Sequence, residues 1–461
     1  MGILRDVLQF LCGPPDKKPL PFPPQHSRPV TQKERNTKKQ PGLSAHSPSI
    51  SPQEGVTVRQ LQTALGLASK VSTVRSSLPI LSCCLMGNGK VIATDLENYL
   101  TLDLPALTFE PVCVPAVQLH RVLRTLSGTV QLEKRGLNLM VQDTCTLPGL
   151  DPQEFPASPA RAAHEPSGEP FVVPARWAAL LPAISLDQTR LPLAGVCLDL
   201  ATGYCVSSDG HRLHALKVPA GVGTAQGIVP LAAAEILACL LARGTVAGQL
   251  YSQQLALTKE QEEVLAVDVN AETPHPVRRK RAALQQELVR PRYACFRTAG
   301  SEFWTRLVEG EFPDYHAVLQ RPAELCPVIL PRAPLIAAIK ACLACAPKDR
   351  SGISLTWVPT GVCLRLDSTE HGHVERLIEC SGWTPGRYVG LNARYLLQAV
   401  QCIRSPTVTV FIKDHATPVF LTEGEFAAVI MPLRIAAPPD YPQPRSIPQS
   451  AGQETSPQPH S

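Results

Sequence analysis

A threefold internal repeat constrains the fold of this chain more than any other feature. One set of similar segments comprises VTVRQLQTALGLASKVS from residue 56, FVVPARWAALLPAISLD from 171 and VILPRAPLIAAIKACLA from 328. Each predicts a short β-rich entry followed by a helix, because its apolar residues recur at spacings of three and four. A second set comprises VCVPAVQLHRVLRTL from 112, GIVPLAAAEILACLL from 227 and VGLNARYLLQAVQCI from 389. These predict a strand and then an amphipathic helix that begins at Pro or Asn, so the chain contains three copies of one unit.

The spacing between the paired segments supports this repeat. Arg59 and Pro115 are 56 residues apart, Pro174 and Pro230 are also 56 apart, and Pro331 and Asn392 are 61 apart. The repeat starts at 59, 174 and 331 are separated by 115 and 157 residues, so the second copy carries an insertion of roughly 40 residues near 258–295. Five Arg and one Lys within PHPVRRKRAALQQELVRPRY make it strongly basic. Two interpretations stay open here, a solvated excursion and an extra contact with DNA or a protein partner.

Alternating stretches between and after the paired helices predict antiparallel hairpins. Examples are KVIATDLENYLTLDL, VCLDLATGYCVSSDG, ISLTWVPTGVCLRLDS, VQLEKRGLNLMVQ and VTVFIKDHATPVFL. The expected fold class is therefore α+β, with two helices on antiparallel sheet in each of three domains. We expect these domains at 54–169, 170–323 and 324–435.

Both ends of the chain have the composition of solvated tails. Ten of the 46 prolines lie before residue 53 and seven after residue 435. Such stretches cannot bury enough apolar surface to offset their ordering entropy, so 1–53 and 436–461 are predicted as disordered tails. Segment 1–53 also holds eight Lys or Arg against three acids, which accounts for the net charge of +5. It could touch phosphates or simply keep the tail soluble.

The cysteine content indicates a reduced, cytoplasmic protein. MGILRDVLQFLCG carries an acid, has a short apolar run and lacks a small-residue cleavage site, so no signal peptide is expected. No stretch reaches 18 consecutive apolar residues, and we expect no membrane contact. We therefore interpret the 15 cysteines as small, reduced core residues. Cys342 and Cys345 form a CxxC inside an apolar helical pattern with no second pair, which favours core packing over a metal or redox site.

Two motifs resemble catalytic or metal sites. SDGHRL places Ser208, Asp209 and His211 within four residues, but such neighbours point in different directions, and a catalytic triad is assembled from separate parts of a fold. Asp209 and Gly210 instead predict a tight hairpin turn. The HGH at 371–373 offers two histidines without further spaced ligands, so we expect no metal, no cofactor and no catalytic residue. An enzymatic activity that depends on His211 is the alternative.

Four ordered motifs resemble the bacterial sliding clamp, the β subunit of DNA polymerase III, over roughly residues 54–435. They are RSSLPILSCCLM with TDLE at 75–97, SSDGHRLHAL at 207–216, LVEGEFPDYHAVL at 307–319 and VIMPLRI at 429–435. The resemblance implies a head-to-tail homodimeric ring of six units, with sheets outside and helices around a central channel. It implies a non-catalytic role, in which the ring encloses double-stranded DNA without reading its sequence and keeps the replicative polymerase at the primer.

Basic residues of the helical segments are candidates for the channel wall, because they would attract phosphates without reading bases. Arg59, Lys70, Arg121, Arg124, Arg176, Arg332, Lys340 and Arg394 all fall in these segments. The resemblance adds loop positions near DNA. The predicted DNA-binding residues are Arg75, Arg190, Lys348, Arg350, Arg121 and Arg124.

The resemblance also implies a pocket for short peptides of the polymerase, the clamp loader and other partners. Its expected members are Leu193, Ser208, Gly210, His211, Arg212, Leu213, Pro313, Val318, Val429, Met431, Pro432, Leu433 and Arg434. Pro192 stands where the family has a bulky aromatic residue, and Ala317 where an Arg is common, so the peptide preference is open. These departures, the basic insertion and the tails motivate an alternative, a clamp-fold scaffold or paralogue with a regulatory role. The tail from Ala436 is expected to screen the pocket.

Overall fold

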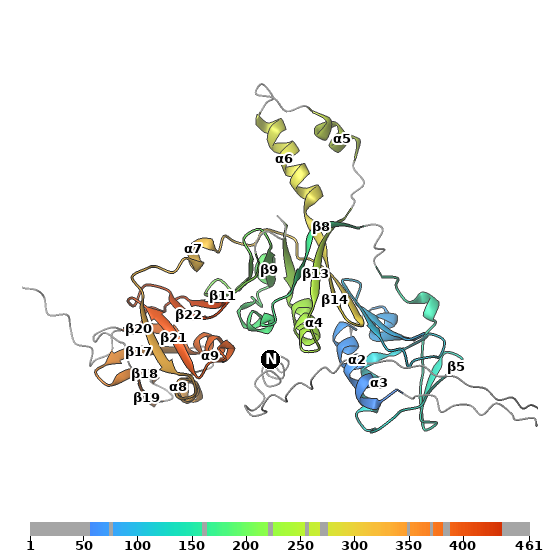
Figure 1. Cartoon of the computed structure of the whole chain (residues 1–461), viewed down its shortest axis with the longest axis horizontal. Coiled ribbons are helices and arrows are strands. Elements are labelled where there is room, and N and C mark those ends of the chain that lie inside the picture. The colour runs from blue at the N-terminus through green and yellow to red at the C-terminus, as the bar shows by residue number, and fades with distance from the viewer. Residues whose placement is uncertain are drawn as a thin grey trace, which may run out of the picture. The chain divides into compact units, whose positions relative to one another are not determined.

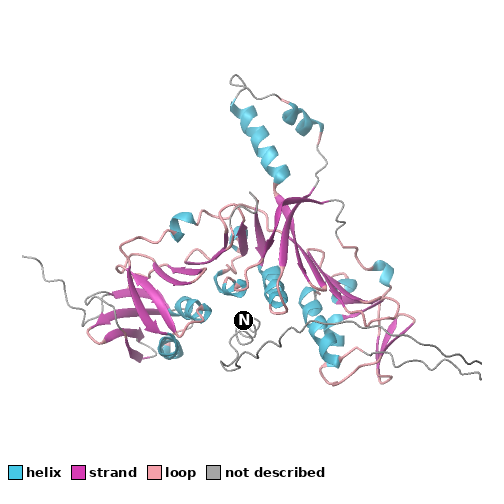
Figure 2. Ribbon diagram, in the orientation of Figure 1, coloured by secondary structure: helices cyan, strands magenta, loops and turns pink. Residues whose placement is uncertain are grey.

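The computed structural model describes residues 56–72, 77–158, 164–219, 225–253, 258–267, 275–347, 351–368, 372–380 and 388–435. The two predicted tails, 1–53 and 436–461, lie outside these residues. The described part is α+β, as predicted, with antiparallel sheets and helices packed beside them (Figures 1 and 2). None of its helices is long and apolar enough to cross a membrane.

The first repeat begins with helix α2, whose sequence provides both an N-terminal cap and an apolar face. Thr57 and Gln60 form a capping box at the start of α2, and Leu61, Leu65 and Ala68 give the helix a buried face. Helix α3 packs against α2. The elements are α2 Val58–Val71, η1 Pro79–Ser82, β1 Cys83–Gly87, β2 Lys90–Thr94, β3 Asn98–Asp103, β4 Val112–Pro115, α3 Ala116–Leu123, β5 Leu132–Arg135, β6 Asn138–Val141, β7 Cys145–Leu147 and η2 Pro152–Glu154.

The second repeat has the same strand order with an insertion before its last two strands. The inserted helices α5 and α6 follow β13, and α6 leads into β14 (Figure 1). The elements are β8 His164–Val172, η4 Trp177–Ala179, η5 Leu181–Ala183, η6 Leu191–Leu193, β9 Gly195–Asp199, β10 Tyr204–Ser208, β11 Arg212–Lys217, β12 Gln226–Pro230, α4 Leu231–Leu241, β13 Ala247–Gln253, α5 Lys259–Ala266, α6 His275–Val289, β14 Pro291–Thr298 and β15 Ser301–Arg306.

The structure corrects one predicted helix. The segment from 171 forms two short 3-10 turns, η4 and η5, in place of an α-helix. Pro182 explains this difference, because it lacks an N–H and its ring would clash with the carbonyl one helical turn earlier. The fully buried Trp177 still fastens the turns to α4, since its indole Nε1 donates to the Ala234 carbonyl at 3.0 Å.

The third repeat contains two α-helices that pack against each other, α8 and α9. Asn392 caps α9 by accepting from the backbone N–H groups of Arg394 and Tyr395. The segment before this repeat holds α7 His316–Leu319. The elements of the repeat are β16 Cys326–Pro331, α8 Arg332–Cys345, β17 Gly352–Val358, β18 Gly361–Ser368, β19 Gly372–Glu379, β20 Tyr388–Asn392, α9 Ala393–Cys402, β21 Thr407–Ile412, β22 Val419–Glu423 and β23 Phe426–Ile430.

Successive repeats share sheets. One eight-stranded sheet has the order β4-β1-β2-β3-β15-β14-β13-β8, and a second has the order β12-β9-β10-β11-β23-β22-β21-β16. The third strand of one repeat thus pairs with the last strand of the next, through β3 with β15 and β11 with β23. A four-stranded sheet, β19-β18-β17-β20, and a three-stranded sheet, β5-β6-β7, complete the described strands.

Each repeat also ends with the same backbone bond, here called the closing bond. An N–H just beyond the last strand donates to a carbonyl two residues before the N-cap of the second helix. The three bonds join Leu150 to Cys113 at 2.9 Å, Val308 to Ile228 at 2.8 Å and Leu433 to Gly390 at 2.8 Å. The apolar ending VIMPLRI is therefore the third copy of a structural device within the repeat.

Candidate functional site

A cavity of about 170 Å3 opens where the second and third repeats share a sheet. Leu213 and Val429 face each other in adjacent strands β11 and β23, and Leu193 reaches the cavity from η6. The wall is mostly apolar, with a few polar groups. It is lined by Leu193, Ser208, Gly210, Arg212, Leu213, Phe312, Pro313, Asp314, Tyr315, Val318, Val429 and Met431.

The SDGHRL motif forms the turn between β10 and β11, as predicted. Gly210 has φ of +89°, a backbone conformation that favours glycine. Asp209 Oδ1 accepts from the backbone N–H groups of His211 and Arg212 at 3.0 and 3.1 Å. Ser208 Oγ donates to the Arg212 carbonyl at 2.7 Å. These side chains are thus occupied in shaping the turn.

Arg212 connects this turn to two other elements. It is buried, its Nε pairs with Asp209 Oδ2 at 2.9 Å, and its guanidinium lies 4.2 Å above the Tyr395 ring of α9. It also donates to the Pro182 carbonyl and to Gln398 Oε1. Burial lowers the pKa of Arg212, while the Asp209 carboxylate opposes that shift. A charge buried with this many partners holds the cavity wall in one position.

The loop from Phe312 to Val318 forms the opposite wall. The Tyr315 hydroxyl donates to Asp199 Oδ2 at 2.7 Å, and Thr202 Oγ1 lies 2.9 Å from the same hydroxyl. Burial, together with the Asp199 carboxylate, raises the pKa of Tyr315 well above its ordinary value. Phe312 and Tyr315 are both buried. Their anchoring lets Val318 and Pro313 line the cavity.

Nine of the thirteen residues expected in the pocket line this cavity. The four others, His211, Pro432, Leu433 and Arg434, do not. His211 lies beside it, since its carbonyl accepts from the Met431 N–H at 2.9 Å. Beyond Met431 the chain turns to β20 and makes the third closing bond. Ile435 therefore lies against Gly390, where a Cβ atom would be 2.7 Å from Ile435 Cγ1.

Sequence reasoning missed Phe312, Asp314 and Tyr315 as cavity residues. All three lie within the motif EFPDYHAVL, so the motif located the wall without distinguishing its members. Pro192, one departure from the family pattern, lies against the loop at Gly310, where its Cγ would be 2.8 Å from a Cβ atom.

Three predicted DNA-binding residues are described and three are not. Arg75, Lys348 and Arg350 lie outside the described residues. Arg121 and Arg124 are exposed at the end of α3. Arg190 pairs with Asp187 Oδ2 at 3.1 Å and lies near the pocket turn, since its Nη1 would be 2.9 Å from a Cβ atom at Gly210.

Two other basic residues of the helical segments have structural roles. Arg176 pairs with Glu423 at 2.6 Å and donates to the carbonyls of Glu423 and Cys402. Arg332 donates to the carbonyls of Val400 and Gln401 at the end of α9. Their guanidinium groups thus have partners within the protein, and their place on a channel wall stays a prediction.

The remaining motifs take part in ordinary packing. Cys342 is buried in α8, as expected for a core residue, and Cys345 is partly buried. His373 Nδ1 lies 2.6 Å from Asp367 Oδ1, and His373 Nε2 lies 3.5 Å from Glu375. Within the described ranges, no three His, Cys, Asp or Glu side chains are grouped to hold a metal ion.

Comparison with known proteins identifies the fold. No protein-family model matches the chain. The β sliding clamp of Caulobacter vibrioides is 25% identical over 409 residues, which cover 81% of this chain and 98% of the relative. The crystal structure of the Bartonella birtlesii DnaN sliding clamp bound to griselimycin superposes with a TM-score of 0.65 at 23% identity, over 82% of this chain and 99% of that one.

Two further sliding clamps agree. The Pseudomonas aeruginosa structure gives a TM-score of 0.62 at 21% identity, over 82% of this chain and 99% of that one. The Bacillus subtilis structure gives 0.63 at 16% identity, over 83% and 98%. The resemblance predicted from the sequence is confirmed: this chain has the fold of the bacterial sliding clamp, the β subunit of DNA polymerase III.

Proposed function

We propose that the chain is a DNA sliding clamp, a non-catalytic cytoplasmic ring that encloses duplex DNA and tethers a replicative polymerase. The fold supports this role, and the relative of similar length is named a β sliding clamp. Enclosure holds DNA without base recognition, so effective concentration at the primer replaces tight binding.

The strand order within the sheets supports the proposal that two copies form a ring. The third strand of each of the first two repeats pairs with the last strand of the following repeat. By the same rule, β19 is the third strand of the third repeat, and β7 is the last strand of the first. Both lie at sheet edges in the described part of the chain. A second copy placed head to tail would pair its β7 with β19, and a two-fold arrangement would close the ring.

The described basic residues suit sequence-independent DNA contact. Arg121 and Arg124 are exposed on α3, and guanidinium groups bind phosphates well. Arg190 lies on the loop before η6 and is half-exposed. Arg75, Lys348 and Arg350 belong to the same proposal through the family resemblance.

The cavity suits a short peptide of the polymerase, the clamp loader or another partner. Its apolar wall would take leucine or phenylalanine side chains, and polar groups such as Ser208 at the turn would fix the peptide backbone. Nine residues of the proposed pocket surround one hollow, which supports this assignment. His211, Pro432, Leu433 and Arg434 would act at its margin.

A retention experiment tests the proposed function. The full chain is loaded onto nicked circular DNA with a clamp loader, and the DNA is then linearised. Enclosure predicts co-elution of protein and DNA before cutting and release afterwards. Retention on linear DNA would contradict enclosure, and a persistent monomer at micromolar concentration would favour the clamp-fold scaffold.

A further inference from the structure

The insertion in the second repeat carries a concentrated positive charge. Helix α6 begins HPVRRKR, which places Arg278, Arg279, Lys280 and Arg281 on a single turn. Arg278 and Arg279 are exposed. Among the described residues neither makes an ion pair or a side-chain hydrogen bond. Their guanidinium groups are therefore available to a partner.

The helix does not neutralise this charge internally. Acidic residues three or four positions away stabilise basic residues of a helix, and like charges at those positions destabilise it. No acid lies at those positions from Arg278 or Arg279 within α6, and Arg281 lies three residues after Arg278. Glu262 and Glu263 of the neighbouring α5 are exposed and form no ion pair with Arg278 or Arg279.

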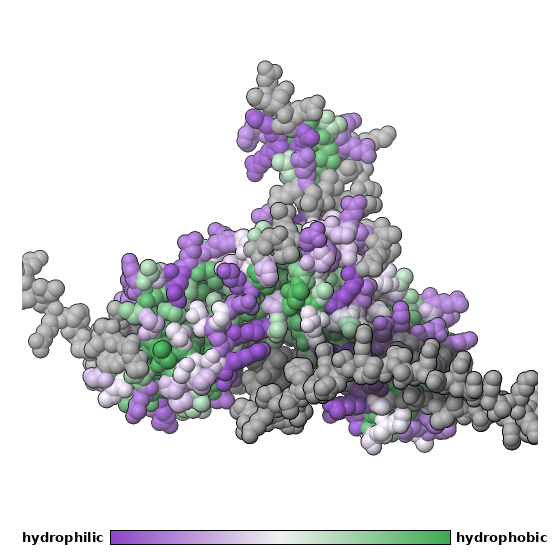
Figure 3. All heavy atoms as spheres, viewed as in Figure 1, coloured by the Kyte–Doolittle hydropathy of each residue, from purple (hydrophilic) through white to green (hydrophobic). Residues whose placement is uncertain are grey.

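Arg281 fastens the two inserted helices together. Its Nη1 donates to the Val267 carbonyl at the end of α5. Helices α5 and α6 also contact each other directly. The exposed arginines thus stand on an ordered helix pair, around which hydrophilic side chains gather beside a smaller apolar patch (Figure 3).

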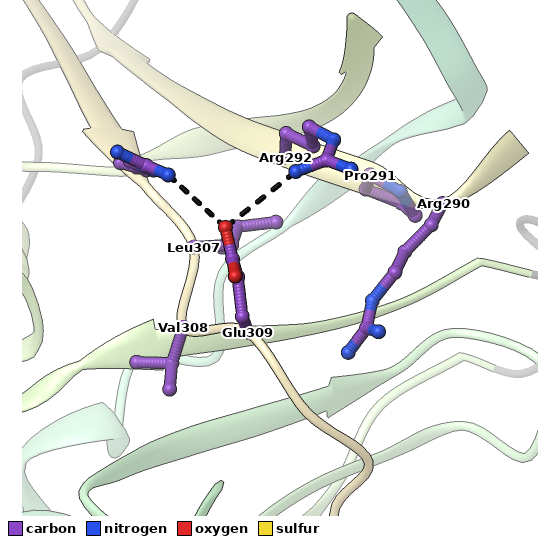
Figure 4. Close-up of a pocket in the computed structure, with 7 residues that line it drawn as sticks. Arg290, Pro291, Arg292, Leu307, Val308 and Glu309 are labelled. Atoms are coloured by element: carbon purple, nitrogen blue, oxygen red, sulfur yellow. Dashed lines mark hydrogen bonds and ion pairs between the residues drawn. The ribbon is translucent and has the colours of Figure 1, made fainter. Parts of the chain in front are cut away.

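A second group of arginines lies at the foot of α6. Arg290, Arg292 and Arg306 line a hollow of about 40 Å3 together with Glu309 (Figure 4). Glu309 Oε1 lies 3.5 Å from Arg292 Nη1 and 3.0 Å from Arg306 Nη2. Arg290 donates to the Gly310 carbonyl. One carboxylate is thus shared by two guanidinium groups, and its side chain is 66% exposed.

This hollow has the chemistry of an anion site. Exposed ion pairs are weak, so a phosphate can compete with Glu309 for the two arginines. Arginine also offers two parallel donors that match phosphate oxygens. Arg306 Nη1 is also 3.5 Å from Glu97 Oε1, so three guanidinium groups lie here with the carboxylates of Glu309 and Glu97.

We infer that the exposed basic turn of α6 and the arginine hollow at its foot form one strip that binds the phosphate backbone of duplex DNA. From Arg279 to Val289 the helix rises about 15 Å, at roughly 1.5 Å per residue, and Arg290 follows directly. Each DNA strand carries one charge per roughly 3.4 Å of helix axis, so the strip faces several phosphates. A protein partner would call for a larger apolar centre than this surface offers. This contact between the strip and DNA is additional to the proposed enclosure, because a closed ring retains DNA without any contact from the inserted helices.

Salt-dependent DNA binding by the full chain tests the inference. Fluorescence anisotropy with a labelled duplex of arbitrary sequence is measured at several salt concentrations for wild type and for Arg278→Gln with Arg279→Gln. Neither arginine makes an ion pair or a side-chain hydrogen bond with the described residues, so the fold should be kept. The matched control replaces two exposed lysines, Lys90→Gln with Lys217→Gln. Each lost phosphate contact should reduce the slope of log affinity against log salt by about 1.

The arginine variant should therefore lose about two units of slope and about tenfold in affinity at low salt, whereas the control stays near wild type. An unchanged slope would overturn the inference. Displacement of the duplex by polyglutamate at equal charge concentration would assign the surface to acidic protein and would also overturn it. The arginine variant should still load onto circular DNA and leave after linearisation. The wild-type protein could fail the loading test while the difference in salt slope persists. That result would contradict the proposed enclosure of DNA but would still support DNA binding by the strip.

Discussion

Tyr315 donates its hydroxyl proton to Asp199 Oδ2 at 2.7 Å, and this bond ties the loop wall of the cavity to the end of β9. Both residues are buried. Asp199 also has His316 Nε2 at 3.8 Å. The carboxylate thus fixes the loop that carries Pro313 and Val318, although Asp199 itself does not line the cavity.

Removing the Tyr315 hydroxyl should loosen this wall. Tyr315→Phe keeps the ring but leaves a buried carboxylate with one donor fewer, which should lower the free energy of unfolding by about 2 kcal/mol. Affinity for a peptide with leucine and phenylalanine anchors should fall as well. Urea unfolding and calorimetric titration measure the two effects. Tyr204→Phe, whose ring lies 6.3 Å from that of Tyr315, is the control and should change neither.

Replacing Arg212 should destabilise the protein even when the new residue is lysine. Arg212→Lys keeps the charge but cannot bind Asp209, the Pro182 carbonyl and Gln398 together. Two lost hydrogen bonds predict a destabilisation of about 2 kcal/mol in denaturant unfolding. The exposed Arg190, which pairs with Asp187, provides the comparison. Arg190→Lys should cost less than about 1 kcal/mol, and an equal cost at both positions would contradict the connecting role of Arg212.

The proposed ring predicts that the β19 edge matters for assembly. Leu377 on β19 is 52% exposed, and Leu377→Asp would place a charge in the proposed joint with β7. The dissociation constant of the dimer should rise at least about tenfold, or about 1.4 kcal/mol. Analytical ultracentrifugation measures it. Val172→Asp on β8 changes a similarly exposed residue on an edge strand outside the joint and should leave the dimer intact.

The buried His214 should make stability depend on pH. Burial lowers its pKa to about 4, while its Nδ1 lies 2.6 Å from the Ala179 carbonyl. Above the unfolded pKa of about 6.5 the imidazole is neutral in both states, so its contribution is complete. Between about pH 6.5 and 4 only the unfolded chain takes up the proton, and roughly 3 kcal/mol is lost.

Urea unfolding at pH 7 and pH 4.5 measures this loss. His214→Gln should be less stable than wild type at pH 7 and should show a smaller decrease on acidification. The exposed His211 gives the control, and His211→Gln should keep the wild-type pH dependence. If His214→Gln retains the full decrease, another group is responsible.

The third closing bond requires glycine at residue 390. A Cβ atom there would lie 2.5 Å from the Leu433 carbonyl oxygen, whereas one at Gly352 would have Leu433 Cδ1 at 3.4 Å. Gly390→Ala should therefore displace the final segment and cost about 2 kcal/mol in denaturant unfolding. It should also speed proteolytic removal of residues after Ile430. Gly352→Ala should have a smaller effect on both measurements.

Sequence reasoning succeeded where local pattern and structure coincide. The repeat spacing and the alternating stretches predicted the hairpins, because alternation of apolar residues follows directly from strand geometry. The SDGHRL turn was predicted for a similar reason, since Asp and Gly have turn-specific chemistry. The resemblance then indicated which segments meet, although they lie far apart in the sequence.

It failed where the outcome depends on contacts between distant segments. A basic residue in an amphipathic helix can face solvent or a carbonyl, and only the fold shows that Arg176 reaches Glu423. The apolar pattern around Trp177 suggested a helix, but a single proline changed its form. The family resemblance implied that Leu433 belongs to the pocket, whereas its N–H donates to the Gly390 carbonyl. Tertiary hydrogen bonds decided the cases of Arg176 and Leu433, and a local proline decided the other.

The closing bonds make it simple to join duplicated units end to end in one chain. Each repeat leaves its last strand and returns to the strand that introduces its second helix, so the polypeptide exits at the same place in every unit. A copied unit can then be joined to the next by a simple linker, without crossing the sheet it has just completed. The duplicated units could differ in length internally, as the second does through α5 and α6, while their exits stayed equivalent.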